Sequence, residues 1–223
     1  RPDGNGVESL SLNAAATTAA TTAGLTVTYT AATGVLLIAG SATPAVYQTI
    51  LDGIQYGNSS DTPTTTSRSV TVLVNDGTAS STGVTSTITV APVNDAPVIT
   101  QAGGTLAYTE GDAATVIDTT LTITDVDDTN IESATVTISG GFVTAEDVLS
   151  FTAASGITGS YNAATGVLSL SGSATLAQYE SVLESVTYRN SNTSNPNTGN
   201  RTVTWVVNDG TASSTGVTST ITV

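Results

Sequence analysis

The sequence predicts an all-β fold of two tandem β-sandwich modules, each with one short helix, and three observations lead to it. Apolar residues recur at every second position in short segments, for example at Val203, Trp205 and Val207, as in strands with one buried face. Turn sequences such as ATG and NDG separate these segments. About a third of the residues are Ser or Thr, and this content favours half-buried strands over helices.

An internal repeat indicates that the chain holds two copies of one module. The stretch NDGTASSTGVTSTITV stands at residues 75–90 and again, unchanged, at residues 208–223, a shift of 133. Upstream, YTAATGVL at Tyr29 matches YNAATGVL at Tyr161 at a shift of 132. Repeats of this length are typical of a tandem array rather than of a single enzyme core.

The two copies differ at their beginnings. VESLSL resembles IESATV, an alignment that sets Asp3 opposite Asp127 and makes the second copy eight residues longer before the next match. Nothing in the first copy matches Val98 to Thr124. We therefore expect a first module that lacks its opening strands, a linker and a complete second module, over residues 1–93, 94–97 and 98–223 respectively.

One segment of each copy departs from the strand pattern. Leu176, Tyr179, Val182 and Leu183 follow the spacing of a helix, and residues 46–54 of the first copy do much the same. The pattern predicts one short helix per module. An irregular crossover between the two sheets is the alternative.

The composition argues against an enzyme. The chain has 18 acidic residues, four basic residues, and neither histidine nor cysteine, so the common acid–base and thiol chemistries lack their side chains. A carbohydrate-active enzyme would need a paired acid and base. The acids at residues 146 and 147, or 180 and 184, are the candidates for such a pair, but neighbouring acids of this kind are expected on a solvated face.

Aromatic residues are expected in the core. Six of the seven tyrosines fall at equivalent positions of the two copies, which favours packing over an exposed platform for sugars. Trp205 has valines as its same-face neighbours, and we expect it to be buried as well.

Charge narrows the range of partners. A net charge of -14 and a pI near 4.1 argue against nucleic acid and anionic membranes, because both require a basic patch. No apolar run of about 18 residues and no leader sequence is found, so we expect no membrane insertion. The expected partners are neighbouring modules of the same protein, with homo-oligomer or filament contacts as an alternative.

Acidic residues concentrate near the junction of the two copies. Between Arg68 and Arg189 there are thirteen carboxylates and no basic residue. Converging carboxylates repel one another and raise one another's pKa unless a cation lies between them. Oxygen ligands without histidine or cysteine favour calcium. The spacing of Asp125 and Asp127 lets two carboxylates point to one side of an extended chain, and Asp128 adds a third.

Three motifs carry a resemblance to a known family. The junction APVNDAPVIT resembles the Asn-Asp linker of cadherins, TEGD resembles their early glutamate motif, and DVDD is similar to their aspartate pair. The chain as a whole resembles the cadherin-like, Ig-like tandem repeats of giant bacterial surface adhesins of the RTX type. That likeness rests on the NDAPV junction, the YNAATGVL hairpin and the VNDGT turn, and it covers nearly all 223 residues.

The resemblance implies a calcium site and an extracellular role. It implies one or two calcium ions at the junction, in a structural and adhesive spacer on a cell surface that calcium stiffens. The alternative is a subunit of a self-assembling filament, in which a strand from a neighbouring chain completes the first module. Asp76 and Asp209, in the repeated NDG, are read as turn residues. The implied ligands are Asn94, Asp95, Glu110, Asp125 and Asp127, with Asp112 and Asp128 as further candidates.

Overall fold

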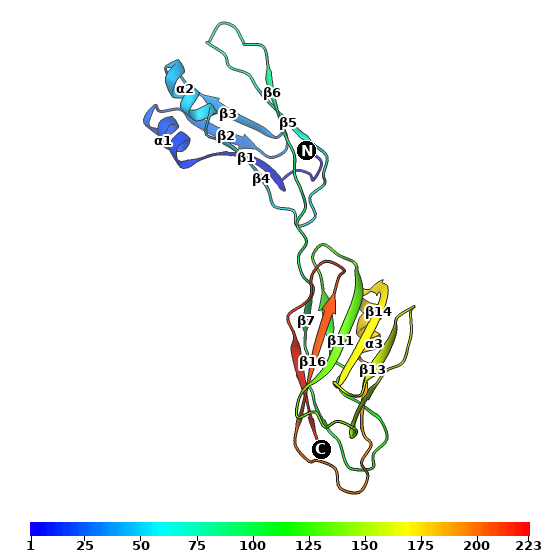
Figure 1. Cartoon of the computed structure of the whole chain (residues 1–223). Helices are drawn as coiled ribbons and strands as arrows, with labels where there is room; N and C mark the ends of the chain where they lie inside the picture. The colour runs from blue at the N-terminus through cyan, green and yellow to red at the C-terminus, as the bar shows by residue number, and fades with distance from the viewer. The chain divides into compact units, whose positions relative to one another are not determined.

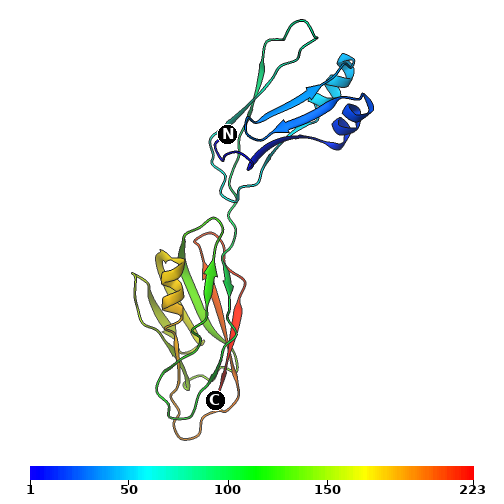
Figure 2. The same ribbon diagram turned by 180° about the vertical axis from the view of Figure 1, so that it is seen from behind.

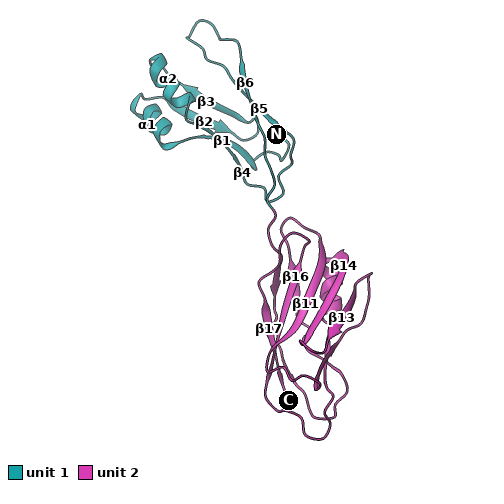
Figure 3. Cartoon of the chain, in the orientation of Figure 1, with its two compact units in different colours: residues 1–93 teal, residues 94–223 magenta.

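The computed structural model describes residues 1–223, which form two units, Arg1–Val93 and Asn94–Val223 (Figure 3). Most regular structure in both units is β-strand, and only three short helices occur, so the prediction of an all-β fold is confirmed. None of these helices is long and apolar enough to cross a membrane.

The larger layer of unit 2 is a six-stranded sheet in the order β13-β14-β11-β16-β17-β8 (Figure 1). Its central strand, β11, pairs antiparallel with both β14 and β16. The edge strand β8 instead pairs parallel with β17. The strands are β8 (Thr105–Ala107), β11 (Asn130–Gly140), β13 (Thr158–Asn162), β14 (Val167–Thr175), β16 (Arg201–Asn208) and β17 (Val217–Thr222).

Smaller sheets and a helix form the rest of unit 2. A three-stranded sheet has the order β12-β15-β9, and β7 pairs with β10. Helix α3 begins after a capping box in which Thr175 and Gln178 exchange hydrogen bonds between side chain and backbone. Figure 2 shows this helix lying across the back of the large sheet. The elements are β7 (Val98–Thr100), β9 (Thr115–Val116), β10 (Thr122–Thr124), β12 (Asp147–Ser150), α3 (Leu176–Leu183) and β15 (Thr187–Asn190).

The core of unit 2 is large and closed. Strand β16 sends Val203, Trp205 and Val207 inward, and each is fully buried. The indole Nε1 of Trp205 donates to Ser219 Oγ at 3.0 Å, so its one polar atom is satisfied inside the core. The prediction that Trp205 lies in the core is therefore confirmed.

Unit 1 consists of three separate two-stranded sheets and two helices. The sheets are β1-β4, β2-β3 and β5-β6. Its buried apolar cluster contains only Ala20, Leu25 and Ile50. The expectation of one helix per module is wrong for unit 1, because Asn13 caps an additional helix, α1. The elements are β1 (Glu8–Leu12), α1 (Ala14–Thr22), β2 (Thr26–Thr30), β3 (Val35–Ala39), α2 (Pro44–Leu51), β4 (Ile54–Asn58), β5 (Arg68–Val72) and β6 (Val84–Ile88).

Strand pairing corrects the alignment of the two copies. In unit 1 Glu8 lies opposite Asn58, and in unit 2 Asp147 lies opposite Asn190, the repeat counterpart of Asn58. Strand β1 is therefore the counterpart of β12, and the alignment of VESLSL with IESATV is wrong. Between this strand and the next hairpin it is unit 1 that carries extra residues, and these form α1.

The corrected alignment defines what unit 1 lacks. Hairpins β2-β3 and β5-β6 correspond to β13-β14 and β16-β17, and α2 corresponds to α3. Unit 1 has no counterpart of β7 through β11. The missing set includes the central strand β11, which in unit 2 joins the two hairpins into one sheet.

Candidate metal centre

Three aspartates converge in the turn that follows β10. Carboxylate oxygens of Asp125, Asp127 and Asp128 all lie within 4.8 Å of one another. The turn brings them together because Asp125 Oδ1 accepts the backbone N–H groups of Asp127, at 3.1 Å, and Asp128, at 2.9 Å. Local sequence alone therefore produces the cluster.

Two oxygens of this cluster are buried without a hydrogen-bond partner, Asp125 Oδ2 and Asp127 Oδ1. A buried acceptor left unsatisfied costs about 1–3 kcal/mol, and more when it is charged. A hydrogen bond from the backbone N–H of Asp95 lowers the pKa of Asp127. Burial and the neighbouring carboxylates of Asp125 and Asp128 outweigh that bond and raise the pKa overall. The turn holds negative charge that the protein itself does not neutralise.

The donor set fits a calcium ion. Calcium binds six to eight oxygens at about 2.3 to 2.6 Å, so two ligands of one ion lie at most about 5 Å apart. The three carboxylates meet this condition. Asp125, Asp127 and Asp128 would hold the ion, and backbone carbonyls or water would complete its shell.

The segment that leads into unit 2 is tied to this turn. The backbone N–H of Asp95 donates to Asp127 Oδ2 at 3.0 Å, so one carboxylate contacts both the leading segment and the cluster. The Asn94 side chain donates through Nδ2 to Asp209 Oδ2 at 2.9 Å. Residues 94 and 95 are therefore docked on the pole of unit 2 at which β11 begins.

Asp209 has a larger role than the sequence indicated. Its Oδ1 accepts the N–H groups of Thr211 and Ala212, which confirms the prediction of a turn residue. Burial raises its pKa, but the hydrogen bonds from Ala212, Asn94 and Thr211 outweigh this effect and lower it overall. The contact between Asn94 and Asp209 was not predicted. Its counterpart, Asp76, makes the same turn in unit 1.

The structure does not bring Glu110 and Asp112 to the cluster. Strand β8 runs parallel to β17 and ends where Ala107 lies opposite Thr222, at the other pole of unit 2. Asp112 there accepts the N–H of Thr109 at 3.0 Å, and Glu110 is exposed. The Asp95 side chain is also exposed, and only its backbone contacts the cluster.

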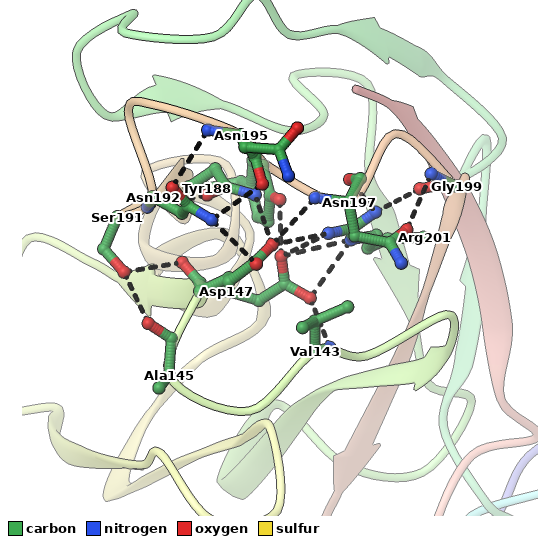
Figure 4. Close-up of polar contacts among 12 residues, drawn as sticks. Val143, Ala145, Asp147, Tyr188, Ser191, Asn192, Asn195, Asn197, Gly199 and Arg201 are labelled. Carbon is green, nitrogen blue, oxygen red and sulfur yellow. Dashed lines mark hydrogen bonds and ion pairs between the residues drawn. The ribbon is translucent and has the colours of Figure 1, made fainter.

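At that other pole, an ion pair lies in the core (Figure 4). Asp147 and Arg201 are 1% and 0% exposed, and Arg201 Nε lies 3.1 Å from both carboxylate oxygens of Asp147. Tyr188 donates to Asp147 Oδ1 at 2.6 Å. Burial and this carboxylate raise the pKa of Tyr188. The expectation that Asp147 lies on a solvated face is wrong.

The same ion pair closes the loop before β16. Arg201 donates to the backbone carbonyls of Asn197, at 2.8 Å, and Gly199. Glu146 accepts the N–H of Asn197 at 3.0 Å and an amide hydrogen of Asn192 at 3.0 Å. These bonds, led by that from Asn197, lower the pKa of Glu146. The acids at 146 and 147 are thus bound to protein groups and hold a loop in place.

Unit 1 repeats this arrangement with different acids. Arg68 Nε donates to Glu8 Oε1 at 2.6 Å, and Tyr56 donates to the same oxygen at 3.0 Å. Asp3 takes the place of Glu146, since it pairs with Arg68 and accepts from Asn58 at 2.7 Å. Asp3 is therefore not a counterpart of the calcium-cluster residue Asp127.

In the second candidate pair for an enzyme, Glu180 is bound to another element of the protein. Glu180 Oε1 accepts the backbone N–H of Ile123 at 2.6 Å and so ties α3 to β10. Glu184 is the C-cap of α3. The two residues stand one helical turn apart at the end of the same helix, so they do not face each other from opposite walls of a cleft.

One signal in the sequence could have revealed the ion pairs. Two of the four arginines, Arg68 and Arg201, stand at equivalent positions of the repeat, each at the start of an alternating apolar strand. A cation on a buried strand face requires an acid close by. The tyrosines and asparagines at 56, 58, 188 and 190 repeat with them.

Comparisons with known proteins give one relative of note. No family model matches the chain. Halomucin from Haloquadratum walsbyi (strain DSM 16790 / HBSQ001) is 44% identical over 101 residues, a match that covers 43% of this chain and 1% of halomucin. The chain therefore spans a very small part of the curated relative that it matches, and it is similar to a short segment of a very long protein.

Proposed function

We propose that this chain is an extracellular structural and adhesive segment of a large surface protein, and that calcium at the N-terminal pole of unit 2 stiffens it. The internal repeat and the similarity to a segment of a very long protein support a role as part of an array. The absence of histidine, cysteine and lysine supports a role without catalysis.

One observation carries the calcium proposal. Two buried oxygens, Asp125 Oδ2 and Asp127 Oδ1, lack partners in a turn whose three carboxylates fit around one ion. The other oxygen of Asp127 already binds the backbone of Asp95. An ion held by this turn would neutralise the repulsion among the carboxylates. It would thereby fix the direction in which residues 94–97 meet unit 2.

Calcium titration of two matched variants tests the site. We expect wild-type protein to bind calcium in calorimetry, and Asp127→Asn to bind at least about 10-fold more weakly, because it removes a charged ligand. Asp61→Asn removes the same charge from an exposed position in unit 1 and is the control. Equal calcium binding by both variants would contradict the site.

X-ray scattering tests the stiffening separately. With calcium, the maximum dimension of the chain is expected to be well defined, and a chelator is expected to broaden the distribution toward that of two folded units on a flexible connection. Asp127→Asn should behave like chelated protein even in calcium. If calcium binds but scattering does not change, the ion has a local role and the spacer mechanism is wrong.

A self-assembling filament subunit is the second candidate, and the open edges of unit 1 favour it. Strands β3 and β5 each pair on one side only, and unpaired edges recruit strands from other chains. Sedimentation at increasing concentration tests it: polymers that grow with concentration support a filament, and a monomer throughout argues against one.

A further inference from the structure

The chain contains three sequons for N-linked glycans, which have the pattern Asn-x-Ser or Asn-x-Thr with x other than proline. They begin at Asn58, Asn192 and Asn200. Such matches arise by chance in a chain rich in serine and threonine, so the sequence alone does not choose among them. The structure separates them, because the glycan is carried by the Nδ2 atom of the asparagine and the three Nδ2 atoms have different surroundings.

Two of the three asparagines use Nδ2 to hold the fold together. Asn58 Nδ2 donates to Asp3 Oδ2, the ion-paired carboxylate of unit 1, at 2.7 Å. Asn192 Nδ2 donates to Glu146 Oε1 at 3.0 Å and to the backbone carbonyl of Asn195 at 2.9 Å. Both asparagines are half-buried. A glycan replaces one of the two hydrogens of Nδ2 and adds a bulky group, so it would disrupt these contacts.

The side chain of Asn200 has different surroundings. It is exposed and makes no hydrogen bond within the protein. Its backbone is nevertheless closely packed, since a Cβ on Gly141, whose φ is +70°, would lie 2.0 Å from the Asn200 carbonyl oxygen. The next residue, Arg201, is fully buried. The fold therefore holds the backbone of Asn200 in place and leaves its side chain in solvent, where a glycan displaces no contact.

We propose that Asn200 is an N-glycosylation site, and that its glycan is attached before β16 joins the large sheet. The donor is an oligosaccharide linked to a lipid phosphate. Asn200 Nδ2 forms a bond to the anomeric carbon of the first sugar and loses one proton to solvent. The bond from that carbon to the phosphate oxygen breaks, and the lipid phosphate leaves with its electron pair. This inference rests on the extracellular location in the proposed function, and not on calcium.

The order of events follows from the place of the sequon in the fold. A transferase must bind the Asn200 side chain and the hydroxyl group of Thr202 together. In the folded unit Thr202 is paired on both sides, with Gly140 and with Thr220. Arg201, which separates the two sequon residues, is buried in its ion pair. The sequon is therefore accessible to a transferase only while β16 is unpaired.

A glycan on Asn200 would cover the loop before β16. Residues 191–200 are mostly exposed. Asn200 ends this loop at the pole of unit 2 where β17 also ends, because Arg201 pairs with Ile221. A bulky and hydrophilic group at this point would restrict the approach of a protease to the loop. We therefore expect limited proteolysis to cut residues 191–200 more slowly in the glycosylated protein than in Asn200→Gln.

Glycopeptide mass spectrometry of residues 1–223, secreted from a host cell that transfers N-linked glycans, tests the site. We expect secreted, folded protein to carry a glycan on Asn200 and none on Asn58 or Asn192, because a glycan at either of these breaks contacts of the fold. Asn200→Gln should fold and carry no glycan.

Two results of this experiment would overturn the site: bare Asn200, or folded protein that carries its glycan on Asn58 or Asn192 instead. The host supplies the route of secretion. Bare Asn200 would therefore contradict the site alone, and the calcium titration and the scattering would still test the proposed function.

Unit 1 offers a matched position at which a site can be created. Residues 67–69, Ser-Arg-Ser, stand where unit 2 has the sequon of residues 200–202, and Ser67 is exposed like Asn200. Arg68 is buried in an ion pair, as Arg201 is. The double variant Ser67→Asn and Ser69→Thr is expected to gain a second glycan in the same host. Its absence would overturn the argument that this position in the fold accepts a glycan.

Transfer in vitro tests the order of events. Unglycosylated protein is mixed with a purified transferase and its lipid-linked oligosaccharide, and folded wild type is expected to accept no glycan. Arg201→Met keeps the sequon but destabilises unit 2, so it should be modified at Asn200. Arg68→Met destabilises unit 1 instead and is the matched control, which should stay unmodified there. Equal modification of folded wild type and Arg201→Met would overturn attachment before folding.

Discussion

The two units share a repeat but differ in how their strands are joined. Unit 2 builds one six-stranded sheet on the central strand β11 and encloses a large core. Unit 1 keeps the same hairpins and the same helix position, yet its sheets remain two-stranded and its apolar cluster contains three residues. The comparison teaches that the hairpins are set by local sequence, whereas the closed core is found only in the unit that contains β7 through β11.

Loss of a buried ion pair is expected to have the largest effect on the stability of the two units. Arg201→Met would leave Asp147 charged and buried without its partner, so we expect a loss of about 3–5 kcal/mol in the free energy of unfolding of unit 2. Arg68→Met should destabilise unit 1 alone. Hydrogen exchange followed by mass spectrometry reports each unit separately. Adding Asp147→Leu to Arg201→Met is expected to restore part of the loss, and no restoration would mean that charge burial is not its cause.

Exchanging the residues at one repeat position tests the role of core closure. Trp205→Val is expected to cost unit 2 about 3 kcal/mol, since it leaves a cavity in a closed core. Val72→Trp is expected to change the stability of unit 1 by less than about 1 kcal/mol, because that position faces an open side. Chemical denaturation followed by circular dichroism measures both. Similar losses in both variants would show that unit 1 has a closed core.

The pH dependence separates the calcium cluster from the other acids. The pKa of Asp127 is raised above 3.8, so calcium-free protein gains stability from this group as the pH falls through that raised value. Protons also displace calcium there. The stabilisation by calcium, about 2.7 kcal/mol at a hundred times its dissociation constant, should therefore shrink on acidification. Melting temperatures with calcium and with chelator, measured from pH 7 to pH 4, test this, and a gap independent of pH would contradict it.

The acids whose pKa is lowered have the opposite effect on the pH dependence of stability. Hydrogen bonds and ion pairs lower the pKa of Asp3, Asp118, Glu146 and Asp209. Their contribution to stability is present above pH 3.8 to 4.5 and is lost as the pH falls further, through their lowered values. Both units should therefore lose stability in strong acid.

Helix caps give the smallest expected effect. The double variant Thr175→Ala and Gln178→Ala removes both hydrogen bonds of the capping box and is expected to cost about 1 kcal/mol. Thr43→Ala removes only a single side-chain cap from α2, so its loss should be smaller. Thermal unfolding of both variants measures the difference. Equal losses would show that the bond from Gln178 adds nothing.

Local patterns made most of the elements predictable. The positions of α2 and α3, the alternation along β16 and the burial of Trp205 follow from spacing alone. The grouping of the three aspartates was also predicted from their spacing, but on an extended chain. The structure instead shows a turn, whose hydrogen bonds connect residues two and three apart.

The remaining features depend on pairing that the sequence does not display. The resemblance to cadherins placed Glu110 with Asp125, but the parallel pairing of β8 with β17 carries Glu110 to the other pole of unit 2. The similarity of VESLSL to IESATV aligned Glu8 with Glu132, but the contacts with the equivalent arginines show that Glu8 is the counterpart of Asp147. In both cases a tertiary contact determines where the residue lies in the fold. The spacing of apolar residues in the sequence does not reveal such a contact.

The parallel pairing of β8 with β17 also has a mechanical consequence. The chain enters unit 2 at one pole and leaves β17 at the other, so tension along the chain pulls these two strands in opposite directions along their length. The hydrogen bonds from Thr220 to Gly104 and from Tyr108 to Thr222 are then loaded together. Unit 2 is thus built to resist extension where β8 meets β17.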